Sequence, residues 1–76
     1  MLSTLDNLRI NDSAIVREIG GLYDIKRRLL DVGMNRGTII KCVLISPFGD
    51  PKAYLIKGAT IAIREEDARN IIVEVI

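Results

Sequence analysis

The clearest periodic pattern in the chain lies between Leu22 and Val32. Apolar residues recur there at spacings of three and four, the stripe of an amphipathic helix, and the opposite face is charged. Gly33 follows directly, where the end of a helix favours a residue that accepts a positive φ. The pattern predicts one helix over 22–32. Its apolar stripe is Leu22, Ile25, Leu29 and Val32. Three of these four residues are expected to fill the open side of a small β domain, and Ile25 is expected to be fully buried.

The other apolar segments are short and rich in Ile and Val, whose branched side chains favour strands. Turn residues separate them at Gly20–Gly21, Pro47–Pro51 and Gly58–Ala59. The leucines of residues 1–12 predict a short turn that lies on the core. The acidic run 65–67 predicts a helical turn, because the N-terminus of a helix favours negative charge. The predicted strands are 14–19, 38–46, 52–57, 60–63 and 72–76.

This series of elements predicts a mostly β fold. Five short strands, one helix after the first strand and a helical turn before the last are typical of a small SH3-like barrel, because a sheet this small has to curl to protect its edges. An open α+β sheet with the helix on one face is the alternative. With 76 residues, the chain is expected to form a single domain over 1–76.

Composition points away from most catalytic sites. The chain has no histidine and one cysteine, which excludes Cys/His zinc sites, Ser-His-Asp or Cys-His catalysis and an internal disulfide. Cys42 lies among apolar residues and is expected to be a small core residue. The consecutive acids of 65–67 fan around a helix and do not converge on a metal. We therefore expect no catalytic, cofactor-binding or metal-binding residues, and we do not expect the protein to be an enzyme.

The charge balance disfavours nucleic acid as a partner. Eleven basic and ten acidic residues give a net charge of +1, so no strong field attracts a phosphate backbone or an anionic membrane. The basic run Lys26–Arg28 lies within reach of Asp24 and Asp31 on a helix, which indicates a neutralised solvent face. The longest apolar run, Cys42–Ile45, is too short to span a membrane. The N-terminus does not resemble a secretory signal, so we expect a cytoplasmic protein without direct membrane insertion.

The predicted hairpin of 38–46 and 52–57 is apolar on both faces. Ile40, Cys42 and Leu44 are expected on one face, and the neighbouring apolar residues on the other. Either the helix and the N-terminal turn cover the second face, or an apolar patch that includes Leu44, Ile45 and Leu55 is exposed. Patches of this kind usually mark an interface.

Several short motifs then appear in a characteristic order. From about Asp12 to Val75 the chain resembles the FeoA family, ferrous iron transport protein A. The motifs that carry the resemblance are Arg28–Met34, Gly37-Thr38, Pro47–Pro51 and Ile61–Arg64, followed by Ala68, Ile71 and Val73.

The resemblance implies an SH3-like barrel and a cytosolic accessory role in ferrous iron uptake. The implied partner is FeoB, a membrane ferrous iron transporter with a GTPase-like domain. That system transports a transition metal ion. Members of the family share no common metal site, so the resemblance implies none on this chain. Two alternatives remain: a stand-alone relative of the C-terminal SH3-like domain of iron-dependent repressors, and a small nucleic-acid-binding barrel.

The resemblance also draws attention to the hairpin. Positions 39, 44, 45 and 55 are often polar in such sequences and are apolar here, which favours a partner surface or a homo-oligomer. The predicted partner-binding residues are Leu29, Leu30, Leu44, Ile45 and Leu55, with Leu30 at the rim of the helix and Leu29 mostly in the core.

Overall fold

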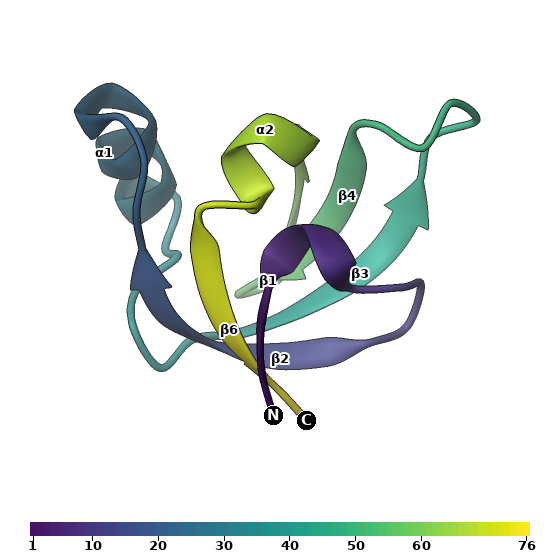
Figure 1. Cartoon of the computed structure of the whole chain (residues 1–76), viewed down its shortest axis with the longest axis horizontal. Helices are drawn as coiled ribbons and strands as arrows, with labels where there is room; N and C mark the ends of the chain where they lie inside the picture. Colours follow the sequence, from purple (N-terminus) through teal and green to yellow (C-terminus); the bar gives the residue numbers. More distant parts are fainter.

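A computed structural model describes all residues from 1 to 76 and contains one six-stranded antiparallel sheet (Figure 1). The strands follow the order β1-β6-β2-β3-β4-β5 across the sheet. The elements along the chain are β1 (Leu2–Thr4), a 3-10 turn η1 (Leu5–Asn7), β2 (Ser13–Ile19), α1 (Tyr23–Asp31), β3 (Ile39–Ile45), β4 (Lys52–Ile56), β5 (Ala59–Ile63), α2 (Glu65–Ala68) and β6 (Ile71–Val75).

The sheet bends strongly around a single core. In Figure 1, η1 and α2 lie over the concave side of the sheet, and α1 stands to one side of it. The core contains fifteen buried residues, drawn from all the strands except β1, from the helices and turns, and from Met34 after α1. It is almost wholly aliphatic. Its largest fully buried side chains are Tyr54, Leu5, Leu8, Met34, Ile40 and Ile56.

The five-strand prediction was one strand short. Residues 2–4, expected to be part of a turn, form β1 and pair with β6, with Leu2 opposite Glu74. The expected turn on the core is the following segment η1, which buries Leu5. A segment of three residues is too short to show the alternation of apolar and polar residues that predicts a strand. It pairs here because β6 offers a free edge. As a result the two chain termini lie side by side (Figure 1).

The end of α1 confirms the role expected for Gly33. Its φ is +99°, in the left-handed region that glycine enters without strain. The Gly33 N–H donates to the Leu30 carbonyl, and the Met34 N–H donates to the Leu29 carbonyl, both at 3.0 Å. This bonding pattern is the Schellman motif, which satisfies two carbonyls at the helix end. It also turns Met34 into the core beside Leu29.

The turn between β4 and β5 lies one residue earlier than predicted. Lys57 and Gly58 both have positive φ, at 48° and 83°, which defines a type I′ turn. Ile56 and Ala59 face each other across this turn. Strand β5 consequently begins at Ala59, and its register with β4 is fixed by a two-residue loop.

Candidate functional site

The two predicted partner residues of α1 differ in burial as expected. Leu29 is 8% exposed and contributes to the core, whereas its neighbour Leu30 is 38% exposed. Consecutive helical residues point about 100° apart, so only one of them can face the sheet. Leu30 therefore lies at the rim of the helix, available to a partner, and Leu29 acts mainly through packing.

A β-bulge rearranges the predicted residues of the hairpin. The register between β3 and β4 shifts between Cys42 and Leu44. Beyond the shift, side chains change faces, because a bulge inserts one residue into the period of two. Leu44, predicted to share a face with the buried Cys42, is 61% exposed, and Ile45 instead packs partly against the core. Ile45 is therefore partly buried and offers less apolar surface to a partner than Leu44 does.

The predicted residues do not form one continuous surface. Leu30 lies on α1 and Leu44 near the end of β3. The helix α1 and the end of β3 lie on opposite sides of the molecule in Figure 1. Leu55 is exposed on β4, where it pairs with Lys41 across the strands. The structure thus offers two separate regions, one on α1 and one on the outer face of the hairpin.

The apolar stripe of α1 is much less covered than predicted. Ile25 is half-buried rather than fully buried, Leu22 is 77% exposed, and Val32 is also exposed. The reason is geometric: the helix touches the core mainly through Leu29 and stands beside the sheet, so its first turn extends beyond the core (Figure 1). Tyr23 is exposed next to Leu22. An amphipathic helix thus leaves part of its apolar face without a partner in this chain.

A groove runs between this helix and α2. It has a volume of about 240 Å³. Leu22 and Ile25 supply its apolar side, and α2, together with Asn70 two residues after its C-terminal end, supplies a polar side. The lining residues are Gly20, Gly21, Leu22, Ile25, Glu66, Asp67 and Asn70.

The glycine pair sets the shape of the groove. The Gly20 N–H donates to the Asn70 carbonyl at 2.8 Å, which joins the end of β2 to the segment before β6. A Cβ on Gly20 would lie 3.1 Å from that carbonyl oxygen, and one on Gly21 would lie 3.2 Å from the Asn70 amide nitrogen. Gly21 also has a φ of +90°. The sequence showed these glycines only as the end of a strand, whereas the structure shows that they let the two sides of the groove approach.

The charge of the groove is negative. Neither Glu66 nor Asp67 takes part in an ion pair, and the only ion pair on α1 joins Arg27 to Asp31 on the helix, at 3.7 Å. Two carboxylates beside exposed leucine and tyrosine side chains favour a ligand that is both apolar and positively charged.

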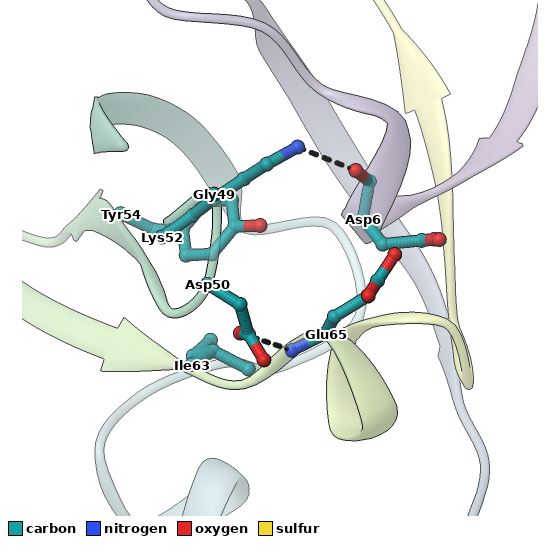
Figure 2. A pocket seen from close by; sticks show the side chains of 7 residues that line it. All are labelled: Asp6, Gly49, Asp50, Lys52, Tyr54, Ile63 and Glu65. Atoms are coloured by element: carbon teal, nitrogen blue, oxygen red, sulfur yellow. Dashed lines mark hydrogen bonds between the residues drawn. The ribbon is translucent and has the colours of Figure 1, made fainter. Parts of the chain in front are cut away.

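A second, smaller cavity lies between β4, η1 and α2 (Figure 2). Its volume of about 20 Å³ is enough for a single water molecule. The Lys52 ammonium spans one side, donating to the carbonyls of Asp6 at 2.6 Å and Leu8 at 2.9 Å. On the other side the Asp50 carboxylate accepts the Glu65 N–H at 2.8 Å. The cavity is a structural junction, in which Asp50 caps α2 from a distant loop.

Burial favours the neutral forms of two side chains in the core, Tyr54 and Cys42. Burial raises the pKa of the Tyr54 hydroxyl above its ordinary value of 10.0, and that hydroxyl donates to the Leu5 carbonyl at 3.3 Å. Burial likewise raises the pKa of the Cys42 thiol. Cys42 lies in the core, as predicted.

No group of three or more His, Cys, Asp or Glu side chains is arranged to hold a metal ion. No helix has the length and apolar character needed to cross a membrane.

Comparison with known proteins identifies the family. The FeoA domain family model matches residues 3–75. A curated relative from Porphyromonas gingivalis, an Fe(2+) transport protein A/Fe(2+) transporter FeoB fusion protein, is 33% identical over 72 residues. The match covers 95% of this chain but only 8% of the fusion protein. The chain belongs to the FeoA family, which is associated with ferrous iron transport.

Solved structures establish the fold class. FeoA of Chlorobium tepidum superposes with a TM-score of 0.93 at 30% identity, over 97% of this chain and 70% of that one. FeoA of Stenotrophomonas maltophilia, described as an SH3 domain protein in complex with zinc, has a TM-score of 0.84 at 28% identity, over 95% and 89% of the two chains. The fold is therefore SH3-like. A manganese-dependent transcriptional repressor shares it at 18% identity, with a TM-score of 0.87 over 99% of this chain and 42% of the repressor, which indicates the fold alone.

Proposed function

We propose that this protein is a non-catalytic, cytosolic accessory protein of ferrous iron uptake that binds the cytosolic part of a FeoB-type transporter. The fusion of both proteins in the Porphyromonas gingivalis relative carries the proposal, because two domains joined in one chain in one organism commonly act together when they are separate in another. A domain with a net charge of +1 and without histidine fits a binding role better than a catalytic one.

The α1 region is the docking surface in this proposal. The exposed stripe of Leu22 and Val32, with Leu30 at the rim, supplies apolar area, and the adjoining groove supplies the carboxylates of Glu66 and Asp67. A complementary segment of the transporter presents an apolar side chain next to a lysine or arginine. The apolar contact contributes most of the affinity, and the opposite charges direct the orientation and speed the association.

The direct test is binding of the purified chain to the isolated cytosolic region of the FeoB transporter from the same organism. Isothermal titration calorimetry should detect a complex, and Leu22→Ser should weaken it at least tenfold. Glu66→Lys should weaken it in a manner that fades at high salt, because salt screens exposed charges. Leu44→Ser is the matched control: it removes another exposed leucine, which lies on β3 rather than beside α1, and should leave the affinity unchanged.

Each failure has a separate meaning. No binding by the unmodified chain would refute the transporter as partner. Binding that survives Leu22→Ser but is lost with Leu44→Ser and Leu55→Ser would move the docking surface to the hairpin. Capture of a DNA-binding repressor in place of the transporter domain would support the relationship to repressor-type domains, and salt-sensitive retention of DNA or RNA would support the nucleic-acid alternative.

A further inference from the structure

Strand β5 forms one edge of the sheet, and one side of it is unoccupied. It pairs with β4 alone, with Tyr54 opposite Ile61 and Leu55 opposite Thr60. At the other edge of the sheet, β1 has only three residues. The five residues of β5 thus offer the longer open edge of the two.

The turn before β5 determines which main-chain groups face outward. In a two-residue type I′ hairpin, the residues flanking the turn form a hydrogen-bonded pair, here Ile56 and Ala59. Because the bonding alternates along an antiparallel pair, Ala59, Ile61 and Ile63 direct their N–H and C=O groups toward β4. Thr60 and Ala62 direct theirs toward solvent. Both residues are exposed, and neither makes a main-chain bond outside the sheet ladders.

This edge lacks the usual protection against pairing. Exposed edge strands commonly carry a charged residue, a proline or a bulge that prevents another strand from adding. Residues 59–63 read Ala-Thr-Ile-Ala-Ile, with no charge and no proline, and their pairing with β4 is regular throughout. The two outward-facing residues have small side chains. A strand can therefore approach without steric or electrostatic opposition.

We propose that β5 pairs with β5 of a second copy of this chain, in an antiparallel arrangement centred on Ile61. Thr60 then faces Ala62 of the partner subunit, and Ala62 faces the partner's Thr60. Each of these pairs exchanges two N–H···O=C bonds, which gives four in all. A two-fold axis passes between the two copies of Ile61, so the contact is closed and produces a dimer rather than a fibre.

Charge supports a second copy as the occupant. In this antiparallel register, the turn that carries Lys57 lies at the same end of the paired strands as the start of the partner's α2, where Arg64 of the partner subunit precedes three acids, the partner's Glu65, the partner's Glu66 and the partner's Asp67, and symmetry repeats this on the other side. Lys57 is exposed and takes part in no ion pair within the chain, and the acids of α2 take part in none either. The strand itself has no charge to repel its own copy. Two short strands bury little area, so the dimer is expected to be weak and dependent on concentration.

The test compares three variants of the full chain by sedimentation equilibrium over a wide range of concentration. Ala62→Pro removes an outward N–H without removing a bond to β4, and Ala62→Lys places a charge on the edge; both should be monomeric. Ala62→Val keeps the main-chain groups and the neutrality, and should dimerise like the unmodified chain. In the dimer, amide exchange at Thr60 and Ala62 should slow as concentration rises.

Three results would overturn the proposal. One is a monomer at every concentration, and another is a dimer that persists in Ala62→Lys. The third is slow exchange at Thr60 and Ala62 that appears only when the transporter domain is added, since the edge would then accept a strand of that protein. If Ala62→Pro does not fold, Ala62→Lys alone decides the question. The edge lies outside the α1 groove, so transporter binding by Ala62→Lys is unchanged, and the two proposals succeed or fail separately.

Discussion

Lys52 joins the N-terminal segment to the rest of the sheet, so replacing it tests how firmly that segment is held. Its ammonium on β4 donates to the carbonyls of Asp6 and Leu8, more than forty positions away in the chain. The two fully buried leucines of this segment, Leu5 and Leu8, depend on the same placement. Lys52→Met keeps most of the apolar stem and removes only the donor.

The expected loss follows from the two bonds. A hydrogen bond to a charged group contributes roughly 1.5–3 kcal/mol, and less when the charge remains partly hydrated. Lys52 is half-buried and one ammonium makes both bonds, so about 2 kcal/mol in total is the reasonable expectation. For a domain of this size that corresponds to a fall in melting temperature of roughly 8–16 °C.

The assay is urea unfolding followed by far-UV circular dichroism, with Lys26→Met as the control. Lys26 is exposed on α1, and its loss should change the free energy of unfolding by no more than about 0.5 kcal/mol. Hydrogen exchange should also show that the β1–β6 amides lose protection before those of β3 and β4. If Lys52→Met is as stable as Lys26→Met, the two bonds contribute nothing and the N-terminal segment is held by its leucines alone.

Two further predictions concern the polar contacts of the core and its rim. Asp50→Ala should lower the free energy of unfolding in urea by about 1 kcal/mol, because the carboxylate caps α2. Asp50→Asn keeps an acceptor oxygen and should lower it much less. Equal losses in the two variants would refute the capping role. For Tyr54, a raised pKa means that folding favours the protonated hydroxyl, so its contribution is complete below the ordinary value of 10.0 and is lost as pH rises above it. The test compares the Tyr23→Phe variant with the double variant Tyr23→Phe/Tyr54→Phe. As pH rises above 10.0, the free energy of unfolding should fall more steeply in Tyr23→Phe, which keeps Tyr54. Parallel curves for the two variants would contradict a raised pKa of Tyr54.

The parts of the fold that the sequence predicted correctly were those encoded locally. The period of α1 and the glycine after it define the helix to within one residue at each end, because both signals lie within a few positions of each other. The strands after it follow from β-branched runs between turn residues. Mostly β architecture and an SH3-like fold were predictable for the same reason.

What the sequence did not reveal depends on contacts between distant segments. The bulge after Cys42 inserts one residue into the pairing with β4, and this alone exchanges the environments of Leu44 and Ile45. No local pattern marks it, because both faces of the strand are apolar. The exposure of Leu22 could not be predicted from the sequence either. The stripe of α1 shows that the helix has an apolar face, but only the fold determines how much of that face the sheet covers.

The pairing of β1 with β6 has a consequence for how this domain is built into larger proteins. Because the first and last strands lie antiparallel, both ends of the chain leave the fold at one point. A longer polypeptide can therefore enter and leave through that point without stretching any element, so the domain can be appended to, or inserted within, another protein while α1 and β5 stay clear of the junction. That geometry suits a module that matches 8% of a fused transporter in the Porphyromonas gingivalis relative.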